Sequence, residues 1–172
     1  MTEVSFTSPK LAQEEEQPTR GKSVFDNLLD EVSAPANVES EKIIKVPGRE
    51  RITLKINTKL PLQRLTTMRK IATTNKKTGE MDIALLNTAL VVAQTECLQY
   101  DGQDAINRET GELVDFKDPE LQSSLRVIEA RAAVQALIPR DADLLRVGGE
   151  ILDACGYGEE EEDDDPLDFD LG

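Results

Sequence analysis

The sequence contains two cysteines, Cys97 and Cys155, and their surroundings decide whether either could act as a nucleophile or a metal ligand. Cys97 lies on an apolar stripe, where a thiol packs as a small hydrophobic side chain. Cys155 lies near the end of a predicted helix and lacks the neighbouring positive charge that would lower its pKa. Because the two are 58 positions apart and neither belongs to a CxxC pair, a zinc or redox motif is excluded and a disulfide is not expected.

The carboxylates and the loops offer no better candidate for catalysis. The sequence has no histidine, which excludes Ser-His-Asp and Cys-His catalysis and every His-containing metal site. Residues 101–104, Asp-Gly-Gln-Asp, resemble the start of a calcium loop, but Gln103, Ala105 and Ile106 stand where that loop needs two ligands and a glycine. No GxGxxG or GxxxxGK(S/T) sequence is present. We therefore predict no catalytic residue, no metal site and no cofactor, and a protein that is not an enzyme.

The charged residues are strongly segregated along the chain. The formal net charge is −14, but residues 1–41 carry −6, residues 42–77 carry +10 and residues 78–172 carry −18. The basic stretch favours an exposed face that is complementary to the chain's own acidic tails or to an acidic partner. Contact with nucleic acid is the alternative. We do not expect nucleic acid as a partner, because the remainder of the chain is strongly negative.

Composition divides the chain into three parts. Residues 1–41 are predicted to be a flexible acidic arm in which Ser23 caps a short amphipathic helix over 24–32. Residues 42–158 are predicted to fold. Residues 159–172 hold nine acidic side chains and are predicted to be a disordered tail. This tail could keep the protein soluble, mask the basic face, or act as a docking peptide anchored by Leu167, Phe169 and Leu171.

Neither a membrane span nor a secretion signal is expected. The longest nearly uncharged apolar stretch, residues 83–94, is too short to cross a bilayer. The first residues lack a basic segment followed by an apolar one. We therefore expect a cytoplasmic protein without a membrane partner.

The patterns of the folded part predict an α+β domain that is mainly helical, with one or two short β-hairpins. Strands over 42–46 and 51–56 flank a Pro-Gly turn, and a weaker hairpin surrounds residues 109–111. Residues 73–79 are predicted to be a polar loop. Helices are predicted over 62–71, 81–98, 119–137 and 141–155, and the third has a strong start in which Asp118 is the cap and Pro119 is the first helical residue. The second of these is apolar around so much of its circumference that it belongs at the centre of a bundle.

The first and the last of these helices have apolar faces that we expect to be functional as well as structural. Pro61 opens the first, whose expected buried face repeats at three-residue steps: Leu62, Leu65, Met68 and Ile71. Asp141 is expected to cap the last, which carries Leu144, Leu145, Val147, Ile151 and Leu152.

Four short motifs follow one another along the folded part. They are Lys-Leu-Pro-Leu at 59–62, Cys-Leu-Gln-Tyr-Asp-Gly at 97–102, Leu-Val-Asp-Phe at 113–116 before a Pro-opened helix, and a last helix that finishes over 149–159. This arrangement is similar to that of the tail assembly chaperones of long-tailed bacteriophages, over roughly residues 43–159. The amino-terminal arm and the basic stretch 42–77 have no counterpart that we can match to the family.

The resemblance implies binding without catalysis. Chaperones of this family coat the tape measure protein, a long helical rod with exposed apolar stripes, and keep it soluble until the tail tube assembles around it. For this chain the resemblance implies the phage tape measure protein as a partner, the tail tube protein as a second candidate, self-association, and a location in the host cell cytoplasm. The expected partner-binding residues are Leu62, Leu65, Met68, Ile71, Leu144, Leu145, Ile151 and Leu152, together with Leu167, Phe169 and Leu171 of the tail.

Two other functions remain open at this point. A nucleic-acid-associated regulator would use its acidic tail to mask the basic face, and its DNA binding would then be sensitive to salt. A virion structural or head-to-tail adaptor protein would be found in mature particles.

Overall fold

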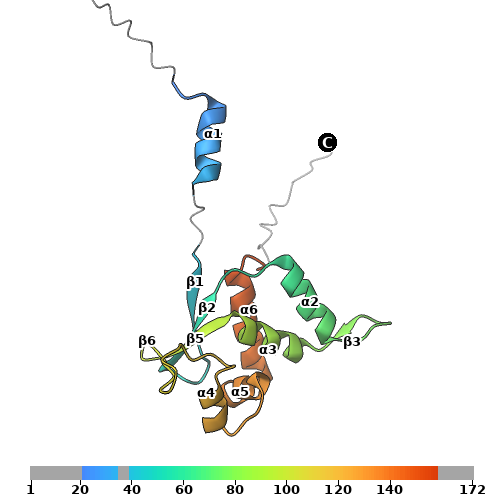
Figure 1. Cartoon of the computed structure of the whole chain (residues 1–172). Helices are drawn as coiled ribbons and strands as arrows, with labels where there is room; N and C mark the ends of the chain where they lie inside the picture. Colours follow the sequence, from blue (N-terminus) through green and yellow to red (C-terminus); the bar gives the residue numbers. More distant parts are fainter. Residues whose placement is uncertain (1–20, 35–38, 159–172) are drawn as a thin grey trace, which may run out of the picture. The chain divides into compact units, whose positions relative to one another are not determined.

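The computed structural model describes residues 21–34 and 39–158, and the chain divides into two compact units, Met1–Val38 and Glu39–Gly172. The expected fold class is confirmed, since 46% of the described residues are helical and 19% lie in strands. Figure 1 shows how these elements follow one another along the chain. Among the helices of the described residues, none combines the length and apolar content that crossing a bilayer requires.

The first unit contains helix α1 (Val24–Ser33), which agrees with the helix predicted there. Its capping box is complete. The backbone N–H of Asp26 donates to the Ser23 hydroxyl at 3.1 Å, and the backbone N–H of Ser23 donates to the Asp26 carboxylate at 3.0 Å. No residue of α1 is buried, although its side chains form an apolar stripe with exposed fractions from 48% to 86%: Val24, Phe25, Leu28, Leu29 and Val32. The start of this helix is therefore stabilised locally, whereas its apolar side has no cover among the described residues.

The second unit is built on an antiparallel sheet of order β1-β2-β5-β6. Strands β1 (Glu41–Lys45) and β2 (Ile52–Asn57) form the predicted hairpin, with Ile44 opposite Leu54. Gly48 occupies the turn with φ of +73°, a conformation that glycine adopts without a steric penalty. Leu54 and Ile56 are fully buried, so one face of β2 belongs to the core.

Helix α2 (Leu62–Ala72) begins after Pro61 as predicted, but its buried face is narrower than the sequence pattern indicated. Leu65 and Met68 are buried, whereas Leu62 and Ile71 are 62% and 69% exposed. Each three-residue step turns by 300° and so falls 60° short of a full turn, and the three steps from Leu62 to Ile71 drift across half of the helix circumference. The middle two residues therefore face the core, where Ala72 joins them, and the outer two face solvent. The polar loop predicted after α2 is a small hairpin of β3 (Thr73–Asn75) and β4 (Glu80–Met81).

The helix predicted over 81–98 is wrong over its last four residues, 95–98. Helix α3 (Ile83–Gln94) ends early, and the chain continues directly as strand β5 (Thr95–Tyr100), which pairs with β2. Cys97 therefore lies on a strand rather than on a helical stripe, although it is fully buried as expected. The free edge of β2 supplies backbone partners for this segment, and those hydrogen bonds replace the ones that another helical turn would form.

Helix α3 is central, as the sequence predicted, and its closest neighbour is α6 (Asp141–Ala154) (Figure 1). A Cβ atom placed on Gly148 of α6 would lie 1.7 Å from Oδ1 of Asn87 on α3, so glycine is required for this close approach. One side of α3 contributes to a core with the sheet and α6, and the other side to a core with α2. Arg140 rather than Asp141 occupies the N-cap position of α6, and its side chain makes no capping hydrogen bond.

The single helix predicted over 119–137 is two helices, α4 (Pro119–Ser124) and α5 (Ala130–Leu137). Asp118 caps α4 as predicted, since its carboxylate accepts from the backbone N–H of Leu121 at 2.8 Å. The break is a Schellman-type turn in which Arg126 has φ of +57° and the N–H of Val127 donates to the carbonyl of Gln122 at 2.9 Å. Glycine usually occupies this left-handed position, and its absence explains why the sequence pattern did not indicate the break. Before α4, β6 (Gln103–Asp104) pairs with β5, and Ile106 bridges to Leu113 in a hairpin-like loop that agrees with the second predicted hairpin.

Candidate functional site

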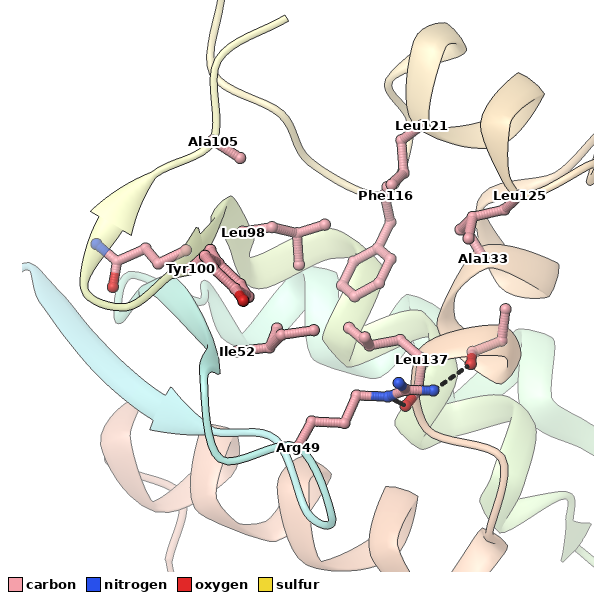
Figure 2. A pocket seen from close by; sticks show the side chains of 12 residues that line it. Arg49, Ile52, Leu98, Tyr100, Ala105, Phe116, Leu121, Leu125, Ala133 and Leu137 are labelled. Carbon is pink, nitrogen blue, oxygen red and sulfur yellow. Dashed lines mark hydrogen bonds between the residues drawn. The ribbon is translucent and has the colours of Figure 1, made fainter.

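An apolar pocket of about 290 Å³ lies in the second unit, between the sheet and helices α4 and α5. Figure 2 shows the Phe116 ring within the pocket, with Leu98 from the sheet on one side and Leu125 from the end of α4 on the other. Its lining residues are Arg49, Ile52, Leu98, Gln99, Tyr100, Ala105, Phe116, Leu121, Leu125, Ala133, Ala136 and Leu137. An engineered cavity of ~150 Å³ in another protein holds benzene, so this pocket has room for a large apolar side chain.

Arg49 is the only charged residue that lines the pocket, and the protein itself uses its hydrogen-bonding groups. Its Nε donates to the carbonyl of Leu137 at 2.9 Å, and its Nη2 donates to the carbonyl of Ala136 at 3.1 Å (Figure 2). These carbonyls belong to the last turn of α5, where the helix has no backbone donors left and where a positive charge is favourable. Arg49 therefore joins the β1–β2 turn to the end of α5 and forms one wall of the pocket.

A second arginine orients the aromatic side chain at the rim. The guanidinium of Arg51 lies 4.5 Å from the centroid of the half-exposed Tyr100 ring, a cation–π distance. The same guanidinium donates to both carboxylate oxygens of Asp101, with Nε 2.8 Å from Oδ1. The hydrogen bond from Arg51 lowers the pKa of Asp101, and the bond to Asp101 raises the pKa of Arg51. Asp101 and Gly102 both have positive φ, which is typical of the two-residue turn that joins β5 to β6.

A buried polar contact holds the other side of the pocket. The Asn107 amide donates to Asp118 Oδ2 at 2.7 Å, while Asp118 Oδ1 caps α4. Burial alone would raise the pKa of Asp118, but the hydrogen bonds from Asn107 and from the backbone N–H groups of Leu121 and Glu120 outweigh it, so the pKa is lowered. This contact ties the 105–114 loop to the start of α4 and so places Leu121 in the pocket wall.

The chemistry of the pocket is that of binding. Its lining includes no carboxylate and no thiol, and its one guanidinium already bonds to the backbone. What it offers a ligand is apolar surface from the sheet, the loop and two helices, with Tyr100 and Leu125 partly open to solvent at the rim. An apolar side chain from another molecule is the group that this surface suits best.

The partner-binding residues predicted on α2 and α6 are only partly accessible. Leu65, Met68, Leu144 and Ile151 are buried in the two cores, so they can contact nothing outside the unit as it is folded. Leu152 is partly buried against the α2–α3 core. Leu62, Ile71 and Leu145 are exposed and remain available as contact residues. The structure does not gather these three into the pocket.

The other residues considered in the sequence analysis are the three apolar residues of the acidic tail, the two cysteines and the possible metal ligands. Leu167, Phe169 and Leu171 lie outside the described residues. Both cysteines are free thiols, and burial is the main cause that raises the pKa of each, which disfavours the reactive thiolate. Within residues 21–34 and 39–158, no three acidic or cysteine side chains come together as a metal-binding group.

Sequence reasoning missed the pocket itself. Its walls come from segments more than 80 residues apart, such as Arg49 and Leu137. One signal was present, because Phe116 is one of only four phenylalanines and directly precedes the strong helix start at Asp118-Pro119. The break after α4, which brings Leu125 to the rim, had no sequence signal.

Comparison with known proteins gives no relative: no family model, no curated protein and no solved structure matches the chain.

Proposed function

We propose that this chain is a non-catalytic tail assembly chaperone of a bacteriophage, which binds the tape measure protein and keeps it soluble until the tail tube assembles. The observation that carries the proposal is the apolar pocket between the sheet and α4–α5, whose single charged group is already bonded to the backbone. A helical client with apolar stripes presents large side chains at regular spacing, and one of them would fill this pocket.

Further exposed apolar groups support the same function. Leu62, Ile71 and Leu145 project from α2 and α6, and α1 presents a whole apolar stripe on a separate unit. A client with several apolar turns could engage more than one of these surfaces, and linked weak contacts give a tighter complex than any one alone. The net charge of −14 would keep such complexes apart from one another.

Co-expression with the tape measure protein encoded in the same gene cluster tests the proposal. The wild-type chain is expected to increase the soluble fraction of that protein several-fold. Ala136→Trp would place an indole at the pocket and is expected to remove most of the increase. Gln135→Trp is the matched control, because Gln135 is exposed on the same helix and does not line the pocket.

Three results would count against the proposal. No gain in solubility with the wild-type chain would refute the chaperone function. Equal activity of the two tryptophan variants, both folded by circular dichroism, would refute the role of the pocket. Stoichiometric amounts of the chain in purified phage particles would favour a structural protein instead.

A further inference from the structure

A shallow hollow on α2 and the strand that follows it combines positive charge with an exposed apolar side chain. It is lined by Thr67, Lys70, Ile71, Thr73 and Lys76, and we call it the α2 hollow. Both lysines are exposed, and Ile71 is 69% exposed. The hollow thus offers two ammonium groups around an apolar patch.

The segment that carries the α2 hollow, residues 59–79, is basic, and Glu80 on the paired strand β4 is the first acidic residue after it. Residues 59–79 contain six cationic side chains and no acidic one: Lys59, Arg64, Arg69, Lys70, Lys76 and Lys77. All six are exposed, and none of them takes part in the ion pairs found within the described part of the chain, which use Lys22, Arg51, Lys55, Arg108 and Arg140. In a chain of net charge −14, this is a concentrated positive surface whose six cations form no ion pair among the described residues.

The chain itself contains a segment of complementary chemistry that starts nearby. Residues 159–170 include nine carboxylates, and Leu167 and Phe169 alternate with Asp168 and Asp170. The last described turn before this segment is held against the start of α2, because the Tyr157 hydroxyl donates to the carbonyl of Leu60 at 2.7 Å. The segment therefore leaves the described structure beside the helix that carries the hollow.

The distances allow the segment to reach the α2 hollow. Helix α2 has eleven residues, so the hollow near its end lies about 16 Å along the helix axis from its start. Residues 159–167 can span about 30 Å when extended. Leu167 and Phe169 can then reach Ile71, with carboxylates of the same segment close to the two lysines.

We infer that the α2 hollow binds the chain's own acidic segment, residues 159–170, through its lysines and Ile71. Tethering favours this occupant, because a segment joined by a short linker to the unit that carries the hollow has an effective concentration in the millimolar range. Nucleic acid carries the same sign of charge but would be repelled by the remainder of the chain. The inference is independent of the chaperone proposal, since it concerns a different surface.

Zero-length carbodiimide cross-linking of the full chain tests the inference, because it joins only carboxylates and amines that are already in contact. Peptide mass spectrometry is expected to find residues 159–170 joined to Lys70 and Lys76, and also to the neighbouring Lys59 and Lys77, at low salt. The yield is expected to fall strongly at 1 M salt, where the screening length is about 3 Å. A mixture of ¹⁴N- and ¹⁵N-labelled protein separates links within one chain from links between two copies.

Two charge-reversal variants with the same net charge provide the control. Lys70→Glu/Lys76→Glu is expected to lower the links from the segment to Lys59 and Lys77 about tenfold, because attraction becomes repulsion at two sites. Lys42→Glu/Lys45→Glu, on exposed positions of β1, is expected to leave them unchanged. All four positions are exposed, so neither variant should affect folding.

The outcomes that would overturn the inference are distinct. Equal yields from Lys42, Lys117 and the hollow lysines would show non-specific attraction. Links found only between ¹⁴N and ¹⁵N chains would make the segment of a second copy the occupant. Absence of links from residues 159–170 to the hollow lysines, together with binding of a single-stranded oligonucleotide that Lys70→Glu/Lys76→Glu abolishes, would show that the basic surface serves nucleic acid instead.

Discussion

The contact between α3 and α6 allows two neighbouring glycines to be compared directly. Gly148 and Gly149 are consecutive in the interior of α6. A Cβ atom on Gly148 would lie 1.7 Å from Oδ1 and 2.5 Å from Cγ of Asn87, whereas a Cβ atom on Gly149 would meet nothing within 4 Å. Alanine at the two positions should therefore change the free energy of unfolding in opposite directions.

The magnitudes follow from three contributions. Alanine is a better helix former than glycine by about 1 kcal/mol, which is the whole effect expected for Gly149→Ala. At position 148, overpacking costs about 1–3 kcal/mol. Asn87 is buried and its Nδ2 donates to the carbonyl of Ile83 at 2.8 Å, so moving its side chain costs about another 1 kcal/mol. Gly148→Ala should therefore destabilise the unit by about 1–3 kcal/mol.

Thermal unfolding followed by circular dichroism measures the difference. For roughly 120 residues, 1 kcal/mol corresponds to about 4 °C in Tm. Gly149→Ala is expected to raise Tm by about 4 °C, and Gly148→Ala to lower it by about 4–12 °C. Asn87→Ala should remove most of the penalty of Gly148→Ala when the two are combined. Equal Tm shifts of the same sign for the two glycine variants would refute the close approach of the helices.

Three further predictions concern the elements around the site. Arg49→Met should destabilise the second unit by about 1 kcal/mol in urea, because two carbonyls at the end of α5 lose their donor; an unchanged midpoint would contradict this. The folded pKa of Asp118 lies below its usual 3.8, so its stabilising contribution is present above pH 3.8 and lost as the pH falls through the folded pKa. The stability difference between wild type and Asp118→Asn should thus shrink on acidification, and a constant difference would argue against the hydrogen bond from Asn107. Ser23→Ala should reduce the helicity of α1, measured by its Cα chemical shifts, because it removes a cap of about 1 kcal/mol.

Sequence patterns that span only a few residues, such as helix caps and tight turns, predicted the local structure correctly. The capping residues Ser23 and Asp118 mark true helix starts, and the Pro47-Gly48 turn joins two strands as predicted. Each of these depends on a side chain and a backbone group within three or four positions, so the sequence contains all the atoms that decide it.

Features that depend on a distant partner were not predicted. Residues 95–100 form a strand because β2 offers them a free edge, although their apolar spacing also fits a helix. The break at Arg126 occurs without glycine, and it lets Val127 pack against the main core. Which apolar residues of α2 and α6 remain exposed was likewise set by their neighbours.

The candidate site also depends on contacts between residues that are far apart in the sequence. The sequence alone established that the protein cannot use histidine in catalysis and that its positive and negative charges lie in separate segments. Composition and the order of charges along the chain do not depend on folding. The pocket exists only once the β1–β2 turn meets the end of α5, where Arg49 supplies the donors that the last helical turn lacks. That meeting joins residues 88 positions apart, and no local pattern encodes such a contact.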